Sequence, residues 1–262
     1  MKSPAGWRQS KFELHPRTGV LRTRRDRKGL PGSRLVGDRT AAFYSRAIPQ
    51  YAQGSLLDLG CGNAPLLGYY SDFVDSVTLV DWANSRHANP LLDLICDLNE
   101  PLLLEAEKFD TVILSDVLEH IRKPQELLNE ISRVLRSGTG VLLMNVPFYY
   151  SIHEEPFDFY RYTRYALNDM CERSGLRIIE ISSLGGIPEI IIDLMSKVLQ
   201  QLPVAGRASA AIVQAVGALL ADHGPGRLLS ARSEDRFPLG YSLIAVKERG
   251  EDRTRAVCEG PD

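Results

Sequence analysis

The chain has 262 residues, of which 44% are hydrophobic, and its formal net charge at pH 7 is −2. This length and composition suit a globular protein that buries a full core in one large domain, or in one domain with a sizeable insertion. The four cysteines form no C-x-x-C pair, which argues against a zinc site or a disulfide framework and favours a reducing, cytoplasmic setting. No apolar segment follows Met1 and no run reaches roughly 18 apolar residues, so neither a secretory signal nor a membrane span is predicted.

The first part of the chain is basic. Residues 1–46 contain twelve Lys and Arg against three Asp and Glu, a balance of +9, so the rest of the chain carries −11. The run from Arg22 to Lys28 suits contact with nucleic acid or anionic lipid. Few aromatic side chains lie inside it, which argues against stacking on single strands. We predict that residues 1–37 form a basic arm or cap, and nucleic acid is not the expected partner.

A helix is predicted over residues 38–48, with Asp38 as its cap and Pro49 near its end. Phe43 and Tyr44 on this helix either close over a ligand or pack the helix against the edge of a sheet. The sequence pattern leaves both alternatives open.

The most informative stretch is residues 55–67. An apolar run containing Asp58 leads into a Gly60-Cys61-Gly62 turn, and Pro65 opens the next apolar run, which predicts a buried strand and then a helix to about residue 73. The two glycines let the backbone reverse its direction and let a ligand approach. Ala64-Pro65 stands where a dinucleotide would need N–H groups for its phosphates, so the turn favours a nucleoside ligand without phosphates.

Further strands are predicted over residues 77–81, 91–98 and 110–115. Asp81 closes the first of them about 20 residues after the glycines, where ribose hydroxyls are usually held. Ligands of parallel sheets bind beyond the carboxyl ends of the strands. The side chains at these ends should therefore meet on one rim of the sheet, and they are Asp58, Asp81, Asp97, Ser115 and Asp116.

The rest of the chain continues the alternation of helices and strands that is typical of a parallel α/β sheet. Helices are predicted over residues 124–136 and 163–173, and strands over residues 140–146, 176–183 and 241–247.

More than 50 residues separate the last two predicted strands. This segment, about 185–239, contains helical patterns over residues 188–202 and 207–222, and then a Gly/Pro/Arg-rich stretch, 223–238, that is predicted to be a mobile loop. An exposed apolar helical hairpin should cover a substrate pocket, a partner in a homodimer or a membrane surface, unless it is a plain packing insertion. Residues 249–262 are predicted to form a charged tail.

Three segments resemble the class I S-adenosylmethionine-dependent methyltransferases. Residues 56–81 resemble the first two motifs of that family, with its Asp-Leu-Gly-Cys-Gly signature at 58–62, although Ala64 replaces a glycine found in many members. Residues 109–121 resemble the fourth motif of a subgroup with Val-Leu-Glu-His-Ile, and residues 153–163 resemble a segment of a branch associated with glycan and cell-envelope biosynthesis. The motifs fall in the family's order over roughly residues 40–185.

The resemblance implies a Rossmann-like sheet of seven strands, mostly parallel with an antiparallel last strand, and helices on both faces. The methyltransferase domain would span residues 38–248, with the helical insertion between strands six and seven. The implied cofactor is S-adenosylmethionine, with Asp81 at the ribose and Asp97 near the adenine amino group. The cofactor-binding residues expected from the motifs are Asp58, Gly60, Gly62, Asp81, Trp82, Asp97, Leu98 and Ser115.

Methyl transfer from a sulfonium requires the protein to align the acceptor, exclude water and, for a hydroxyl acceptor, remove a proton. A helix starting near Asp116 would place Asp116, Glu119 and His120 on one face. With His153 this set resembles that of metal-assisted ubiquinone-pathway and small-RNA 2′-hydroxyl methyltransferases. Three alternatives stay open: catalysis by Asp116 and by His120 or His153 as general base, a divalent metal on all four residues, or a role in capping and packing only.

Aromatic side chains crowd residues 148–165, together with basic side chains that suit a phosphate or carboxylate. Phe157 and Phe159 are expected in the core instead. The predicted acceptor-binding residues are Tyr149, Tyr150, His153, Arg161 and Arg164.

The predicted function is O-methylation of a sugar, glycolipid or other small molecule by S-adenosylmethionine. One alternative is an RNA methyltransferase, which the basic arm and the metal set favour. Another is a catalytically silent, methyltransferase-like scaffold, which the intact acids and glycines of the motifs argue against.

Overall fold

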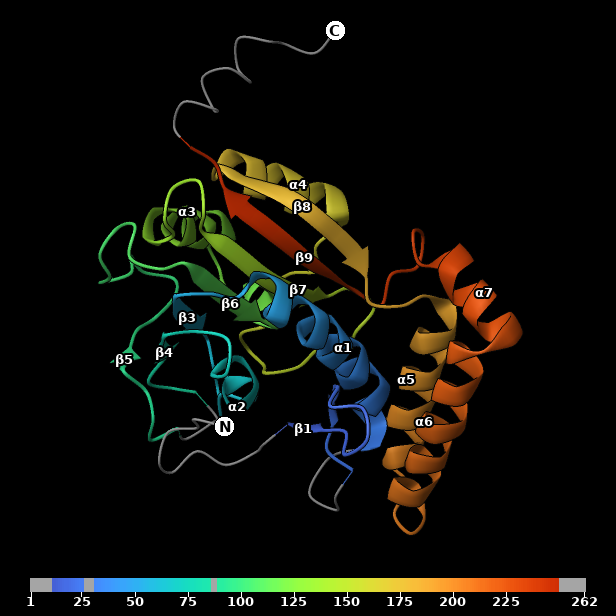
Figure 1. Cartoon of the computed structure of the whole chain (residues 1–262). Helices are drawn as coiled ribbons and strands as arrows, with labels where there is room; N and C mark the ends of the chain where they lie inside the picture. Colours follow the sequence, from blue (N-terminus) through green and yellow to red (C-terminus); the bar gives the residue numbers. More distant parts are fainter. Residues whose placement is uncertain (1–10, 26–30, 86–88, 250–262) are drawn as a thin grey trace, which may run out of the picture.

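The computed structural model describes residues 11–25, 31–85 and 89–249. Seven strands form one sheet in the order β5-β4-β3-β6-β7-β9-β8 (Figure 1). All neighbouring strands are parallel except that β9 runs antiparallel to β7 and β8, so the predicted fold is confirmed. The strands are β3 (Ser55–Leu59), β4 (Ser76–Asp81), β5 (Leu94–Ile95), β6 (Thr111–Ser115), β7 (Val141–Pro147), β8 (Leu176–Ser183) and β9 (Gly240–Lys247).

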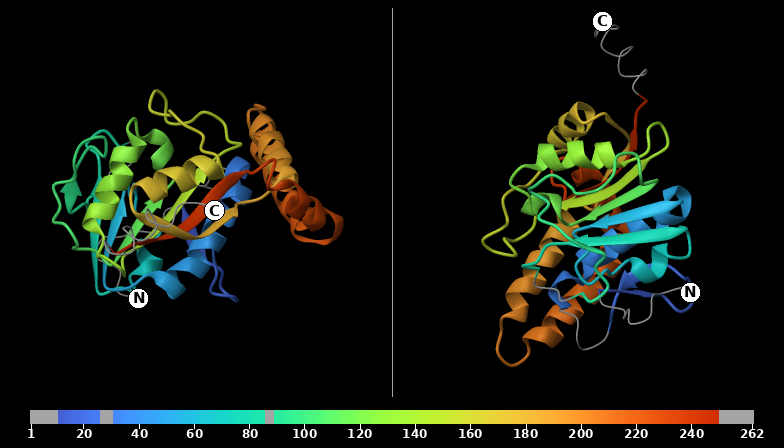
Figure 2. Two further views of the ribbon diagram at one scale, coloured as in Figure 1. Left: turned by 90° about the horizontal axis from the view of Figure 1, so that it is seen from above. Right: turned by 90° about the vertical axis from the view of Figure 1, so that its left-hand side faces the viewer.

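Helices cover both faces of the sheet (Figures 1 and 2). Side chains alternate between the faces of a strand, so Leu57 and Leu59 enter one core with α3 (Pro124–Val134) and α4 (Arg164–Arg173). Leu56 enters the other core, with α1 (Arg34–Tyr51) and α2 (Leu67–Tyr70). The predicted helix over residues 124–136 is confirmed within two residues, because Pro124 occupies its first turn and its leucines and isoleucines lie on one buried stripe.

The first long helix differs from its prediction at both ends. It begins at Arg34, so Asp38 lies inside the helix and is not its cap. Pro49 also lies inside, where it cannot donate to the carbonyl group of Ser45. The Tyr69 hydroxyl donates to that carbonyl oxygen at 2.9 Å, which satisfies the group and lets the helix continue to Tyr51.

Three other boundaries were wrong. The third predicted strand, 91–98, shrinks to Leu94–Ile95 at the sheet edge, where the Asp93 carboxylate accepts from the backbone N–H of Leu79. The helix after the glycine turn is only Leu67–Tyr70. No α-helix starts at Asp116, because this residue has a left-handed backbone (φ 53°) and is followed by a short 3₁₀ turn, Leu118–His120.

Part of the predicted basic arm is ordered against α1. Strands β1 (Phe12–Leu14) and β2 (Leu21–Thr23) form an antiparallel hairpin, with Phe12 and Leu21 buried in the core beside α1. Asp38 accepts from the backbone N–H of Thr23 at 2.8 Å, which fixes the hairpin to the helix. A short 3₁₀ turn, Pro31–Ser33, leads into α1. The predicted arm also includes residues 1–10 and 26–30, which lie outside the described residues.

Three helices lie beside the sheet, and in the sequence they connect β8 to β9 (Figures 1 and 2). They are α5 (Ile187–Gln200), α6 (Gly206–Asp222) and α7 (Gly224–Ser233). The first two match the predicted helical patterns. The predicted mobile loop, 223–238, is mostly the helix α7 instead, held where the Ser230 hydroxyl donates to Glu189 at 2.8 Å and the Ile187 N–H donates to the Ser233 hydroxyl at 3.0 Å. None of the helices in the described ranges is long and apolar enough to cross a membrane.

Candidate active site

The turn after β3 supplies the first part of the rim. Gly60 and Gly62 have positive φ values of 66° and 52°, and a Cβ on Gly60 would lie 2.6 Å from the side chain of Val117, so glycine is required there. Asp58 is buried below the turn and accepts from the Tyr70 hydroxyl at 2.8 Å. Burial, with the nearby charge of Asp81, raises the pKa of Asp58 to about 7.

Asp81 ends β4 at the same rim and is 6% exposed. Its Oδ1 accepts from the backbone N–H of Trp82 at 2.9 Å. Its Oδ2 is buried and has no hydrogen-bond partner among the described residues. A buried carboxylate oxygen without a donor is costly, so this atom is suited to accept a hydrogen bond from a ligand.

The other predicted cofactor residues have varied surroundings. Asp97 is exposed, and its Oδ1 accepts from the backbone and side-chain N–H groups of Asn99 at 2.9 and 2.8 Å. Leu98 is buried, and Ser115 is half-buried at the end of β6. The half-buried ring of Trp82 meets the ring of Phe157 edge to face at 4.9 Å, which joins the rim to the segment after β7.

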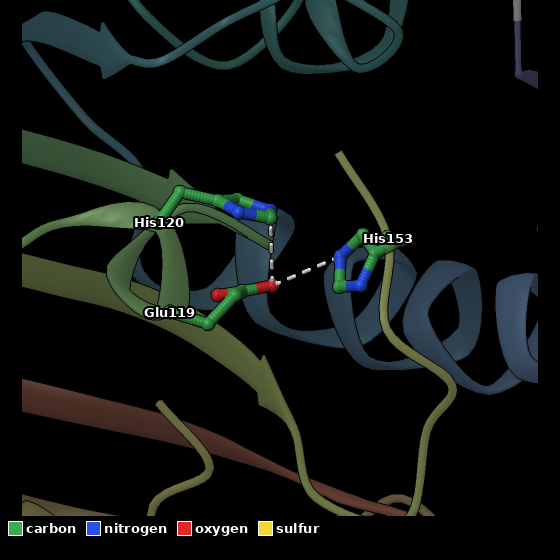
Figure 3. Close-up of side chains that lie close together, drawn as sticks. All are labelled: Glu119, His120 and His153. Carbon is green, nitrogen blue, oxygen red and sulfur yellow. Dashed lines mark ion pairs between the residues drawn. The ribbon is translucent and has the colours of Figure 1, made fainter. Parts of the chain in front are cut away.

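Three polar side chains gather beside this segment (Figure 3). Glu119 is fully buried, and neither of its carboxylate oxygens has a hydrogen-bond partner among the described residues. Its Oε1 lies 3.8 Å from the Nε2 of His120 and 3.7 Å from the Nε2 of His153. One ligand atom from each residue lies within 4.8 Å of the other two, so the cluster is suited to hold a proton or a metal ion.

Hydrogen bonds at the opposite ring nitrogens orient both imidazoles. His120 Nδ1 lies 2.8 Å from the carbonyl oxygen of Phe157, and His153 Nδ1 lies 3.2 Å from that of Ser151 and 3.3 Å from a carboxylate oxygen of Asp158. Oxygen atoms at these positions accept only, so each neutral ring carries its proton on Nδ1. The Nε2 lone pairs of both rings are therefore available beside Glu119.

Burial and charge shift the titration of this cluster. Burial raises the pKa of Glu119, and the neighbouring charge of Asp116 raises it further. Burial would lower the pKa of His153, but the carboxylates of Glu119 and Asp158 outweigh it and raise that pKa above the ordinary value. With this raised pKa, His153 holds a proton more tightly than an ordinary imidazole does.

Asp116 does not complete this cluster. Its left-handed backbone turns it away from the predicted shared helix face, and it is not one of the three clustered ligands. Its Oδ2 accepts from Lys11 Nζ at 3.1 Å and its Oδ1 accepts from Asn145 Nδ2 at 2.5 Å. The expectation that Asp116, Glu119 and His120 share a helix face, with His153 as a fourth ligand, is therefore corrected to a cluster of Glu119, His120 and His153, with Asp116 in a separate group.

That separate group contains residues that sequence reasoning missed. Asn145 is a buried amide within the apolar strand β7, and Tyr44 donates to its Oδ1 at 2.9 Å. A lone amide in an otherwise apolar buried strand was a signal that could have been used. Lys11 had no comparable signal, because it contacts a residue 105 positions away. Tyr44 and Phe43 are both buried, which confirms that α1 packs on the sheet.

The predicted acceptor segment is divided between internal contacts and exposed rings. Arg161 binds Asp158 through both terminal nitrogens, at 2.5 and 2.8 Å, and also reaches nearby carbonyl oxygens. Arg164 lies 3.2 Å from Asp235 and over the ring of Tyr241. Tyr149 is 42% exposed, and the half-buried Tyr150 has Lys197 Nζ 3.3 Å from its ring centre. Phe157 is half-buried and Phe159 is exposed, and neither belongs to either main core, so the expectation that they are core residues was wrong.

The methyltransferase-domain family matches residues 34–181. A ubiquinone biosynthesis O-methyltransferase from Parvibaculum lavamentivorans is 28% identical over 115 residues, which are 39% of this chain and 46% of that protein. The match therefore spans about half the length of this curated relative.

Several solved structures share the fold. A Haloferax volcanii protein described as a methyltransferase, solved with the Trm112 methyltransferase activator, is 17% identical with a TM-score of 0.53, over 83% of this chain and 94% of that one. A SAM-dependent methyltransferase from Archaeoglobus fulgidus is 18% identical with a TM-score of 0.51, over 84% and 99%. The [4+2]-cyclase SpnF is 18% identical with a TM-score of 0.51, over 82% of this chain and 84% of that one. Because this neighbour is described as a cyclase, the fold alone does not define the reaction. The methyltransferase-domain family model covers residues 34–181, which is more than half of this chain. The chain therefore belongs to that family, among the class I S-adenosylmethionine-dependent methyltransferases.

Proposed function

We propose that this protein transfers the methyl group of S-adenosylmethionine to an oxygen atom of a sugar, glycolipid or other small molecule. The observation that carries the proposal is the position of an imidazole pair and a buried carboxylate next to the cofactor rim. Trp82, which follows Asp81, contacts Phe157, and the carbonyl oxygen of Phe157 orients His120. A proton acceptor therefore lies near the place expected for the cofactor.

The residues of the rim fit S-adenosylmethionine, which supplies a methyl group already activated as a sulfonium. The buried, unpartnered Oδ2 of Asp81 is suited to a ribose hydroxyl. Gly60 and Gly62 leave room for the backbone of the turn to approach a ligand. Asp97 is exposed and remains the proposed acceptor for the adenine amino group. Leu98 and Trp82 would form apolar walls of the same site, and Ser115 would form a polar one.

For a hydroxyl acceptor the chain must remove a proton. We assign this step to His153, whose Nε2 lone pair faces the cluster while Nδ1 is held by Ser151 and Asp158. After it accepts the proton, Glu119 stabilises the imidazolium that forms, with Oε1 3.7 Å from Nε2. His120 occupies the equivalent position on the other side of Glu119 and is the alternative base.

We also assign to Lys11, whose Nζ lies 3.1 Å from Oδ2 of Asp116, the attraction of an anionic acceptor. The Lys11→Met substitution should raise KM for an acceptor with a carboxylate or phosphate group and leave kcat nearly unchanged. The free energy of unfolding should fall by less than about 1 kcal/mol, because the Lys11–Asp116 pair is partly exposed. Arg22→Met is the matched control, since Arg22 pairs with Glu13 on the same hairpin. An unchanged KM for every anionic acceptor would contradict this role of Lys11.

A divalent metal bound by Glu119, His120 and His153 is the alternative use of the cluster, because three protein ligands with an open position are typical of catalytic zinc sites. If His153 acts as a general base, dialysis against EDTA should leave the initial rate of methyl transfer unchanged, and added Zn²⁺ or Mg²⁺ should not increase it. Loss of activity in EDTA and its recovery with one metal would instead favour the metal reading.

Calorimetric titration with S-adenosylmethionine, followed by assays with sugar, glycolipid, phenol and RNA acceptors, tests the proposed function. Binding of the cofactor with methylation of a hydroxyl is the expected result. Failure to bind it would favour a scaffold. Methylation of RNA with a steep salt dependence, lost when residues 1–37 are removed, would favour the RNA alternative.

A further inference from the structure

A lysine of the helical insertion reaches the candidate active site. Lys197, in the last turn of α5, places its Nζ 3.3 Å from the centre of the Tyr150 ring. The ring of Tyr150 meets the ring of His153 edge to face, with the ring centres 5.2 Å apart. His153 lies beside Glu119 (Figure 3) and is the proposed general base. A chain of contacts therefore leads from the insertion to the imidazole that would accept the proton.

Side chains hold the ring of Tyr150 in place. The segment that contains it, residues 148–163, forms neither a helix nor a strand. The Tyr150 hydroxyl lies 3.1 Å from Ser33 Oγ, and the ammonium group of Lys197 lies over the ring. The face of an aromatic ring attracts a cation, and more strongly when both are partly out of water. Because the side chain of Lys197 is only 19% exposed and Tyr150 is half-buried, water screens this attraction only in part.

Lys197 is itself fixed in position. Its Nζ donates to Asp193 Oδ2 at 2.6 Å, one turn earlier on the same face of the helix, and Asp193 is 1% exposed. A buried ion pair adds little stability compared with apolar residues of similar volume, so what this pair holds in place is the better reason for its presence. Gln200, at the end of α5, accepts from the backbone N–H of Gly32 at 2.9 Å, which joins the helix to the turn that carries Ser33.

The contact with Tyr150 restricts a motion that the hydrogen bonds of His153 leave open. The oxygen atoms that orient this imidazole lie at its Nδ1, and a ring held along one edge can still tilt about that edge. Edge-to-face contacts with the rings of His120 and Tyr150, at 4.7 and 5.2 Å, limit the tilt. Of these two rings, Tyr150 is the one that Lys197 holds.

We propose that Lys197 positions the general base of this active site by holding Tyr150 against His153. The role rests on the proposed function, in which His153 removes the proton of a hydroxyl acceptor. Lys197 acts through Tyr150 and need not touch the acceptor, so it is a positioning residue. A misplacement of about 1 Å in an active site can cost about a hundredfold in rate. The insertion would therefore serve the reaction as well as the packing of the chain.

The Lys197→Met substitution should lower kcat for methyl transfer by about tenfold to a hundredfold. KM for S-adenosylmethionine should not change, because Lys197 contacts Asp193 and Tyr150 and not the glycine turn. Lys197→Arg should restore most of kcat, since a guanidinium group also stacks on an aromatic face and pairs with a carboxylate. The double variant Asp193→Leu/Lys197→Met should behave like Lys197→Met, and it leaves no unpaired buried carboxylate that could unfold the protein.

The matched control is Lys247→Met. The side chain of Lys247 is 14% exposed and pairs with Glu107, but it lies near the start of β7, at the edge of the sheet away from the rim. Its loss should leave kcat unchanged. A similar fall of kcat in Lys247→Met and Lys197→Met would overturn the proposal, because any half-buried lysine would then have the same effect. A natural kcat in Lys197→Met would also overturn it.

A double-mutant cycle shows whether Lys197 acts through Tyr150. In the Tyr150→Leu background, which has no ring to hold, the additional change Lys197→Met should alter kcat by less than about twofold. An equal loss of kcat in the natural and the Tyr150→Leu backgrounds would overturn the proposal.

Nuclear magnetic resonance tests the contact itself and needs no acceptor. A nuclear Overhauser effect between the ring protons of Tyr150 and His153 is expected in the natural protein, because their ring centres lie 5.2 Å apart. It should persist in Lys197→Arg and in Lys247→Met and weaken in Lys197→Met. An unchanged effect in Lys197→Met would overturn the positioning role even if the protein methylates its acceptor. A natural protein that methylates no hydroxyl acceptor would overturn the proposed function, and with it this role, whatever the spectra show.

Discussion

Replacement of His153 by asparagine should lower kcat for methyl transfer by about 10² to 10⁴, the usual contribution of a positioned general base. KM for S-adenosylmethionine should change little, because His153 contacts Glu119, Ser151 and Asp158 and not the glycine turn. Initial rates at saturating cofactor measure the effect. His223→Asn is a suitable control, since His223 is exposed and its ring atom Nδ1 lies 2.9 Å from the carbonyl oxygen of Leu219, in the preceding helix.

The pH profile separates a base from a structural histidine. His153 must be neutral to accept a proton, so kcat should rise with pH and reach half its maximum above the ordinary histidine pKa of about 6.5, because carboxylates raise the pKa of His153. Glu119→Gln removes one of them and should move this limb to lower pH. If the limb persists in His153→Asn and is lost in His120→Asn, the base is His120.

The Asp81→Ala substitution should weaken binding of S-adenosylmethionine by about 10- to 150-fold, which is the 1.5–3 kcal/mol typical of a hydrogen bond to a charged group. The reason is that Oδ2 of Asp81 is buried and has no partner among the described residues, so the ligand would supply its only donor. Calorimetric titration measures the dissociation constant directly.

Asp97→Ala provides the comparison for Asp81. The Asp97 carboxylate is exposed and already accepts from Asn99, so its removal should cost less affinity. Equal losses of affinity for S-adenosylmethionine in the two variants would contradict the expectation that the buried Oδ2 of Asp81 makes the stronger contact with the cofactor. Thermal unfolding should be followed for both, because loss of Asp81 also removes the acceptor for the N–H of Trp82.

Local signals predicted most of the sheet. The strand from Ser55 to Leu59 is confirmed because an apolar run is stopped by a turn that only glycine permits at Gly60. Helix α3 is confirmed because Pro124 and a regular apolar stripe mark it without help from other elements. These features depend on neighbours in the sequence, which is why sequence reasoning reaches them.

The incorrect predictions concern features that depend on distant residues. Helix α7 was predicted to be a loop because its apolar pattern is weak. It is held in place because its Ser230 hydroxyl donates to Glu189 and its Ser233 hydroxyl accepts from the backbone N–H of Ile187. Asp116 lies in a left-handed conformation, and its backbone N–H donates to the carbonyl oxygen of Asn145 on the next strand. The cluster of Glu119 and His153 was anticipated from motifs. The place of Lys11 beside Asp116 was not, because no local pattern encodes it.

The N-terminal segment also has a consequence for how the protein is made. Its contacts join Lys11 to Asp116 and Gly32 to Gln200 and Gln214, over 105, 168 and 182 positions. Contacts of such long sequence separation form late in folding, and chains emerge from the ribosome with the N-terminus first. Phe12 and Leu21 can pack on α1 early, because the two elements are close in the sequence, but the bonds of Gly32 to Gln200 and Gln214 can form only after α5 and α6 have been synthesised. The Lys11–Asp116 pair and the bonds of Gly32 to α5 and α6 should therefore be among the last contacts to form as the protein folds.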